Sequence, residues 1–168
     1  MSKNRSTTQE MISASMNGVV VISNNDADIS SLAGTISGAG TAAVGAAVSV
    51  NDIGGDVTAR MANAAVRTGG AVSVTADTSG TIRSVAAGMA GGSSAAAAGS
   101  NTTNAITSTV LAQLSSMQQW GEPPTTMVRA RDSSTIESLA GTVVGGGAAG
   151  GGAALAQNFL GRNANNED

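Results

Sequence analysis

The chain has 168 residues, a formal net charge of −3 and only 11% charged residues, with one Trp, one Phe, no Tyr, no His and no Cys. Without His and Cys it lacks the commonest metal ligand and general base, any thiolate site and any disulfide, and its few basic residues form no patch for a nucleic acid. We therefore expect no cofactor, no metal and no nucleic-acid partner.

The near absence of aromatic residues limits how the chain can build a core. A compact globule normally anchors its core with large side chains, whereas here Val, Ile, Leu, Met and Ala must pack against 23 Gly residues. This composition favours thin layers in close contact.

Residues 1–17 are polar and depart from the pattern that follows. Thr7 and Glu10 have the spacing of a capping box, and Gly18 is available as a stop. We predict a short amphipathic helix here that caps the open end of the fold, with a frayed tail as the alternative. The N-terminus, residues 1–5, lacks an apolar h-region, so no signal peptide is visible.

Short β-prone runs then alternate with turn residues. Strands are predicted over residues 18–23, 44–50, 57–61 and 72–77. The last is the clearest, because Val72 and Val74 share one face and polar residues share the other. Polar or Gly-rich turns are predicted at residues 24–28, 54–55, 69–70 and 77–80.

Two aspartates one residue apart, Asp26 and Asp28, invite a calcium interpretation. An EF-hand loop also needs a third ligand, a central Gly and a distal Glu, and none is in place. We therefore predict turn residues rather than a metal site.

A helical periodicity competes with the strand pattern. Apolar residues occupy positions i, i+3, i+4 and i+7 in every unit, in the first as Ile29, Leu32, Ala33 and Ile36. The glycines of residues 145–147 and 150–152 oppose a helix, because each interior Gly costs about 1 kcal/mol relative to Ala. We predict an all-β chain and keep an α-containing fold as the alternative.

The segment around residues 117–126 replaces an earlier connector and contains Trp120, Pro123 and Pro124. Pro-Pro cannot donate to a strand ladder and marks a loop or an edge. Trp120 is a candidate ligand contact, and the alternative is a side chain that folds back over a small core. Residues 161–168 form a polar, acidic tail, which we predict to be disordered.

An internal repeat organises these elements. Residues 29–33 recur as 82–86 and 136–140, at steps of 53 and 54 residues, and an Asn follows each leading Ile by 22 residues. The structural repeat positions are Ile29, Ile82, Ile136, Asn51, Asn104, Asn158, Val72 and Val74. We predict a parallel β-solenoid of about three 53–54-residue repeats over residues 18–160.

Two finer predictions follow from the spacing. The three asparagines would stack as an amide ladder if each unit closes a whole number of turns. Residues 47–50 also recur as 71–74, only 24 residues later. This second recurrence suggests that each unit consists of two shorter turns.

Three kinds of functional site are not expected. A phosphate-binding loop needs a Lys after the Gly run, and the only Lys is Lys3. Membrane insertion is not expected, because the uncharged runs are diluted with Ser, Thr, Asn and Gly and the mean hydropathy is +0.11. The acidic residues lie mainly in predicted turns and no position breaks the repeat symmetry, so we expect no enzyme.

The repeat style resembles a known class of proteins. The motifs are Val-x-Val-x-Ala-Asp, Ile-x-Ser-Leu-Ala-Gly, Ala-Val-Ser-Val-Asn-x-Ile and Val-Thr-Ala-Arg-Met, best seen in residues 45–61 and 71–92. They resemble the repeats of large bacterial filamentous-haemagglutinin-like and leukotoxin-like adhesins, which are autotransporter or two-partner-secretion exoproteins. The resemblance implies a long β-solenoid shaft that supports adhesion at the cell surface.

The expected function is therefore a non-catalytic structural or adhesive repeat module of a bacterial surface or secreted protein. Its expected partners are further copies of the chain, through end-to-end association, and a host or cell-surface glycan or protein. One alternative is a self-assembling filament or sheath subunit joined through exposed strand edges. Another is a membrane-active Gly/Ala-rich toxin segment. The expected location is extracellular or at the cell surface if the chain belongs to a longer exported protein.

Overall fold

The computed structural model describes residues 11–15, 18–63, 65–66, 70–116, 118–119 and 125–161. The regular structure in these ranges is entirely β-strand. The all-β prediction is confirmed, and the α-containing alternative is wrong for these residues.

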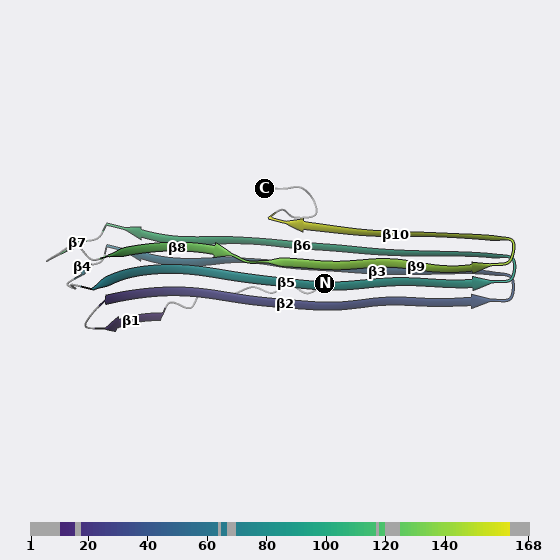
Figure 1. Cartoon of the computed structure of the whole chain (residues 1–168), viewed down its shortest axis with the longest axis horizontal. Coiled ribbons are helices and arrows are strands. Elements are labelled where there is room, and N and C mark those ends of the chain that lie inside the picture. Colours follow the sequence, from purple (N-terminus) through teal and green to yellow (C-terminus); the bar gives the residue numbers. More distant parts are fainter. Residues whose placement is uncertain are drawn as a thin grey trace.

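Each repeat runs out along one sheet and returns along a second sheet that faces it (Figure 1). The outward strands are β2 (Gly18–Ala39), β5 (Ala71–Gly92), and the pair β8 (Thr126–Asp132) and β9 (Thr135–Gly146). The returning strands are β3 (Ala42–Ala62), β6 (Ala95–Ser115) and β10 (Ala149–Leu160). The short strands β4 (Ala65–Val66) and β7 (Gln118–Gln119) pair where one repeat passes to the next.

Strands from successive repeats are parallel neighbours in both sheets. Sheet A has the order β1-β2-β5-β8, with β9 also paired to β5, and sheet B has the order β10-β6-β3. Each repeat therefore adds one strand, or rung, to each sheet. The result is the predicted parallel β-solenoid in a two-sided form, in which one repeat makes one complete turn.

The register follows the sequence repeat residue by residue. Ile29 pairs with Ile82 and Ile82 with Ile136 in sheet A, while Asn104 pairs with both Asn51 and Asn158 in sheet B. The offset is 53 residues between the first two repeats and 54 between the next two. The extra residue lies in the connector after Gln119, because β4 and β7 still pair at an offset of 53.

The prediction of two shorter turns per repeat is wrong. Residues 47–50 lie in β3 of sheet B and pair with residues 100–103, whereas residues 71–74 lie in β5 of sheet A. The 24-residue echo has no counterpart in the packing. Val48 and Val50 lie exposed on the outer face of β3, whereas Val72 and Val74, at the echoed positions, are completely buried.

Three of the predicted turns are also wrong. The strands pass without interruption through residues 24–28, 54–55 and 77–80. Polar residues continue a strand here because they lie in register with polar residues of the next repeat, as Asn25 does with Thr78. At the equivalent position of the third repeat the strand is interrupted between β8 and β9, where Asp132 Oδ1 accepts a hydrogen bond from the Ser134 amide at 2.9 Å.

The predicted N-terminal helix is wrong where the structure describes this segment. Met11–Ser15 forms β1, an antiparallel neighbour of residues 18–22 of β2. A helix of so few residues is marginal in water, whereas the edge of β2 offers ready-made hydrogen-bonding groups. Residues 1–10 and 16–17 lie outside the described residues, as does the predicted tail beyond Gly161.

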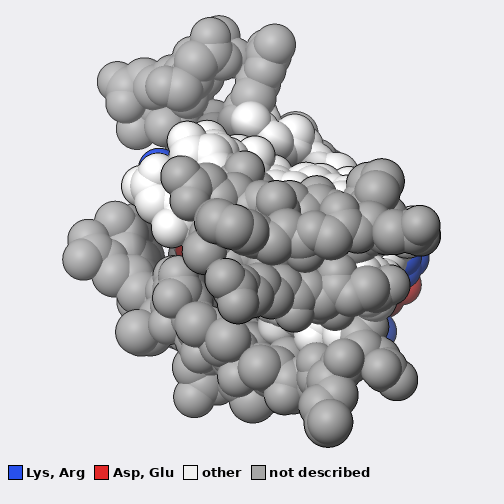
Figure 2. Space-filling model, turned by 90° about the vertical axis from the view of Figure 1, so that its left-hand side faces the viewer, with Lys and Arg blue, Asp and Glu red and all other residues white. Residues whose placement is uncertain are grey.

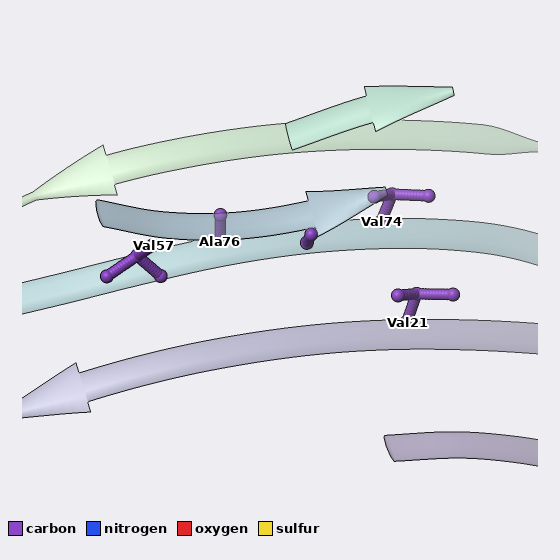
Figure 3. Close-up of a cluster of buried hydrophobic side chains, with 5 residues drawn as sticks. Val21, Val57, Val74 and Ala76 are labelled. Atoms are coloured by element: carbon purple, nitrogen blue, oxygen red, sulfur yellow. The ribbon is translucent and has the colours of Figure 1, made fainter. Parts of the chain in front are cut away.

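The core between the sheets changes in thickness along the strands. Near the connectors it contains Val and Ala side chains from both sheets, shown in Figure 3: Val21, Val57, Ala59, Val74 and Ala76. In the middle Ile53, Ile82 and Ile106 pack together. Tight turns after Ala39, Gly92 and Gly146 join the outward strands to the returning ones. Near these turns the buried hydrophobic side chains are alanines, among them Ala43, Ala90 and Ala96.

Glycine lets the two sheets approach closely in the thin region. A Cβ placed on Gly88 would lie 2.5 Å from the carbonyl oxygen of Gly99, and one on Gly45 would lie 2.6 Å from that of Met89. Contacts of this length exclude any larger residue without movement of the backbone. Gly45 and Gly88 thus belong to the packing surface between the two sheets, in the thin layers that the composition suggested.

Candidate assembly surfaces

A ladder of three asparagines crosses the interior of sheet B. Asn51 Nδ2 donates to Asn104 Oδ1 at 2.7 Å, and Asn104 Nδ2 donates to Asn158 Oδ1 at 2.9 Å. Asn51 and Asn104 are buried. The amide groups form this chain because each Asn lies on the inner face of its strand and the parallel register superposes equal positions.

Serines of the facing sheet extend the ladder into a polar layer. Asn51 Nδ2 donates to Ser31 Oγ at 2.9 Å, and Ser138 Oγ donates to Asn158 Oδ1 at 2.9 Å. Ser49 also contacts Ser31, at 2.9 Å between the hydroxyl oxygens. Ser31 and Ser138 belong to a Ser that recurs two residues after each repeated Ile, and this recurrence is the signal by which they could have been recognised.

The middle of this layer contains hydroxyl groups without hydrogen-bond partners. These are the side-chain oxygens of Ser84, Ser100 and Thr102, all of them buried. An unpaired buried hydroxyl costs free energy. The polar layer therefore combines hydrogen-bonded amides with unpaired hydroxyl groups, and the amide-to-amide hydrogen bonds join all three repeats.

Both ends of the stack present strand edges. Among the described residues, β3 pairs only with β6, and β10 also pairs only with β6. In sheet A, β1 covers residues 18–22 of β2, and no described strand covers β2 beyond them. These edges carry backbone N–H and C=O groups able to pair with a further rung.

The charged residues of the outer face of sheet A form a small mixed cluster. Arg83 Nη1 lies 3.7 Å from Asp28 Oδ2, and Arg83 Nε lies 3.2 Å from Glu137 Oε2. All three side chains are more than half exposed. In Figure 2, which looks along the strands from the connector end, the acidic and basic atoms visible at the right-hand margin lie beside one another.

The remaining candidate residues are dispersed. Asp26 accepts a hydrogen bond from Ser79 Oγ, and within the described ranges no three His, Cys, Asp or Glu residues lie close enough to hold a metal ion. Asp77 and Asp132 lie one position out of register, because Asp77 pairs with Arg131. Trp120 and the two prolines lie outside the described residues.

The outer face of sheet B carries shallow apolar hollows. One of about 300 Å³ is lined by residues 46–48, 99–101 and 153–155 of the three strands. A second of about 380 Å³ lies nearer the tight turns. Both are crossed by all three rungs, so they are features of the repeat rather than a single specialised pocket.

Within the described residues no helix could cross a membrane. Comparisons of the chain with protein-family models, with curated proteins and with solved structures found no match.

Proposed function

We propose that this chain is a non-catalytic structural and adhesive repeat module of a bacterial surface or secreted protein. The observation that supports this proposal best is the amide ladder, which joins equal positions of all three repeats. Equal positions of successive repeats pair in both sheets, so stability comes from neighbour contacts along the stack. Such a fold supplies length and surface without needing a specialised site.

The dimensions of the described part support a role within a larger stack. A strand of 22 residues, such as β5, extends about 70 Å at about 3.3 Å per residue, whereas three rungs at about 4.8 Å rise only about 14 Å. Three repeats are therefore much wider than they are tall. A shaft that projects from a cell needs many more rungs, supplied by more repeats or by more copies.

An added repeat tests the structural part of the proposal. Residues 71–124 are duplicated in tandem, which inserts one complete rung into each sheet. We expect the free energy of unfolding and the urea m-value both to rise, because the m-value scales with the surface exposed on unfolding. An insert that unfolds independently, and leaves the main transition unchanged, would contradict the proposal.

Cell binding tests the adhesive part. Beads coated with the chain are expected to bind cells, and the triple variant Asp26→Ala, Asp77→Ala, Asp132→Ala is expected to bind equally well. Val74→Asp places a charge at a completely buried position and is expected to unfold the chain and abolish binding. If the triple variant loses binding while it stays folded, a specific acidic site carries the function instead.

A filament or sheath subunit is the second candidate, favoured by the open strand edges. In a continued stack, β10 of one copy would pair with β3 of the next, and Asn158 would extend the ladder to Asn51 of that copy. This contact joins two different edges and does not close, so it generates filaments. Its register is defined: residue 157 would lie opposite residue 50 of the next copy.

Single cysteines test this register, since the chain has no Cys of its own. Val50→Cys and Gln157→Cys lie on exposed, outward positions of β3 and β10. We expect an equimolar mixture of the two variants to form a disulfide under mild oxidation, and native protein to grow fibres as its concentration rises. A strictly monomeric chain without cross-links would exclude the filament and leave the structural module.

A further inference from the structure

The outer face of sheet A near the tight turns has a regular relief. Two columns of large apolar side chains project from it, Leu32, Val85 and Leu139 in one and Ile36, Met89 and Val143 in the other. All six are at least partly exposed, Leu32 by 82% and Ile36 by 84%. We call these columns ridge 1 and ridge 2.

Columns of very small residues separate the ridges. Between them lie Gly34, Ala87 and Gly141, and beyond ridge 2 lie Gly38, Gly91 and Gly145. We call these columns groove 1 and groove 2. A Cβ placed on Gly38, Gly141 or Gly145 would meet nothing within 4 Å, so the chain's own packing does not require glycine there.

The order ridge, groove, ridge, groove along the strands makes this face complementary to itself. Consider two copies that face each other across a two-fold axis, which runs parallel to the stacking direction and passes over position 35 of β2. This axis places position 32 of one copy opposite position 38 of the other, and position 36 opposite position 34. Ridge 1 of each copy then meets groove 2 of the other, and ridge 2 meets groove 1. The same operation holds in β5 and β9, because their residues share the register of β2.

The charged residues of this face lie outside the area that the two-fold arrangement would cover. The column next to ridge 1 contains Arg83 and Glu137, in register with Ser30. The two-fold axis places this column opposite positions 40, 93 and 147 of the second copy, which lie in the tight turns at the end of the sheet. The charged groups thus stay at the rim in water, and the covered area is uncharged.

We propose that the outer face of sheet A, from ridge 1 to groove 2, binds a second copy of this chain through this two-fold arrangement. The contact involves sheet faces rather than strand edges, so it is independent of the end-to-end stacking described above. Because both copies keep the same stacking direction, a paired stack can still grow by further rungs.

The area sets the strength of the contact. Six residue steps of about 3.3 Å and three rungs spaced about 4.8 Å apart give a patch of about 20 by 14 Å, roughly 300 Å² per copy. This is well below the roughly 800 Å² per partner of stable complexes. We therefore expect three repeats to form a weak, reversible dimer, which strengthens as rungs are added.

A substitution that fills a groove should block the dimer contact without changing the stability of the monomer. Gly38→Leu fills groove 2 without a clash inside the chain, and Gly99→Leu is the matched control on the outer face of sheet B, where a Cβ also meets nothing within 4 Å. Sedimentation of the full chain over a range of concentrations is expected to show a monomer–dimer equilibrium for the native chain and for Gly99→Leu. Gly38→Leu is expected to remain monomeric.

Cross-linking checks the geometry. An equimolar mixture of Leu32→Cys and Gly38→Cys is expected to form a mixed disulfide, and a mixture of Leu32→Cys and Gly99→Cys is not. The proposal is overturned if the native chain stays monomeric at every concentration, as expected if another partner covers this face. It is also overturned if Gly38→Leu dimerises like the native chain, or if both mixtures cross-link equally.

Discussion

Asn51 and Asn104 are 53 residues apart in sequence, yet the amide nitrogen of the first donates to the amide oxygen of the second at 2.7 Å. The contact exists because one repeat makes one turn of the solenoid. Asn104 is the central member of the ladder, since it also donates to Asn158. Its side chain therefore connects all three repeats.

Replacing the central amide is expected to be costly. Asn104→Ala removes two amide hydrogen bonds from a buried layer and leaves Asn51 and Asn158 with serine partners alone, so we expect a loss of about 1 to 3 kcal/mol in the free energy of unfolding. Asn24→Ala, on the exposed outer face of β2, is expected to change it by less than about 0.5 kcal/mol. Urea denaturation measures both, and equal losses would show that the ladder contributes nothing specific.

A second pair of substitutions tests which residues of the apolar pattern build the core. Ile82 is completely buried, whereas Leu32 is 82% exposed. We expect Ile82→Ala to lose about 2 to 5 kcal/mol through the cavity that it leaves. Leu32→Ala is expected to cost less than about 0.5 kcal/mol. Thermal or urea unfolding of the two variants checks the difference, and a costly Leu32→Ala would contradict the assignment of its face.

Ile29 and Leu32 show how a strand can carry apolar residues at helical spacing. Ile29 and Leu32 lie three positions apart, which places them on one face of a helix but on opposite faces of a strand. In the structure Ile29 packs inward with Ile82, while Leu32 projects outward. The two positions are apolar for different reasons, because Ile29 packs in the core and Leu32 belongs to ridge 1 on the outer face. A single sequence shows that both residues are apolar but not which of them is buried.

The repeat itself was predictable, because a recurrence at 53 and 54 residues specifies which positions stack. The ladder of Asn51, Asn104 and Asn158 follows directly from it. The continuity of the strands was not predictable from local signals, since Gly54 and Gly55 usually mark a turn. In β3 they continue a strand beside Thr107 and Ser108, so the neighbouring repeat overrides local turn preference.

The thin part of the core predicts an unusual sensitivity to a single methyl group. Gly88→Ala would place its Cβ 2.5 Å from the Gly99 carbonyl oxygen, and overpacking of this kind costs about 1 to 3 kcal/mol. Gly91→Ala lies on the outer face, where the nearest atom is 4.0 Å away, and is expected to be neutral or slightly stabilising. Melting temperatures of the two variants provide the comparison. Equal shifts would mean that the sheets are not in close contact at Gly88.

The ion pairs of Arg83 are expected to matter little for stability. Its partners Asp28 and Glu137 are largely exposed, and exposed pairs contribute between about 0 and 1 kcal/mol. We expect Arg83→Ala to lower the free energy of unfolding by less than about 1 kcal/mol, with the difference from the native chain reduced further in high salt. Urea titrations at low and high salt measure this, and a larger, salt-independent loss would indicate a structural role for the Arg83 stem.

The unpaired hydroxyl groups predict a substitution that stabilises the protein. Thr102 is completely buried and its Oγ1 has no hydrogen-bond partner. Thr102→Val keeps the shape of the side chain and removes the unpaired group, so we expect the free energy of unfolding to rise by about 1 to 2 kcal/mol. Thr103→Val, at the adjacent outward position, is the control and is expected to change it by less than about 0.5 kcal/mol.

The sign of the Thr102→Val effect separates two accounts of the polar layer. A gain would mean that the amide ladder alone provides the useful hydrogen bonds and that the hydroxyl groups near it weaken the core. A loss of 1 kcal/mol or more would mean that a bound water molecule satisfies Thr102, Ser84 and Ser100 together. In that case Ser84→Ala, measured in the same urea titration, should be destabilising by a similar amount, because both substitutions remove a ligand of the same water.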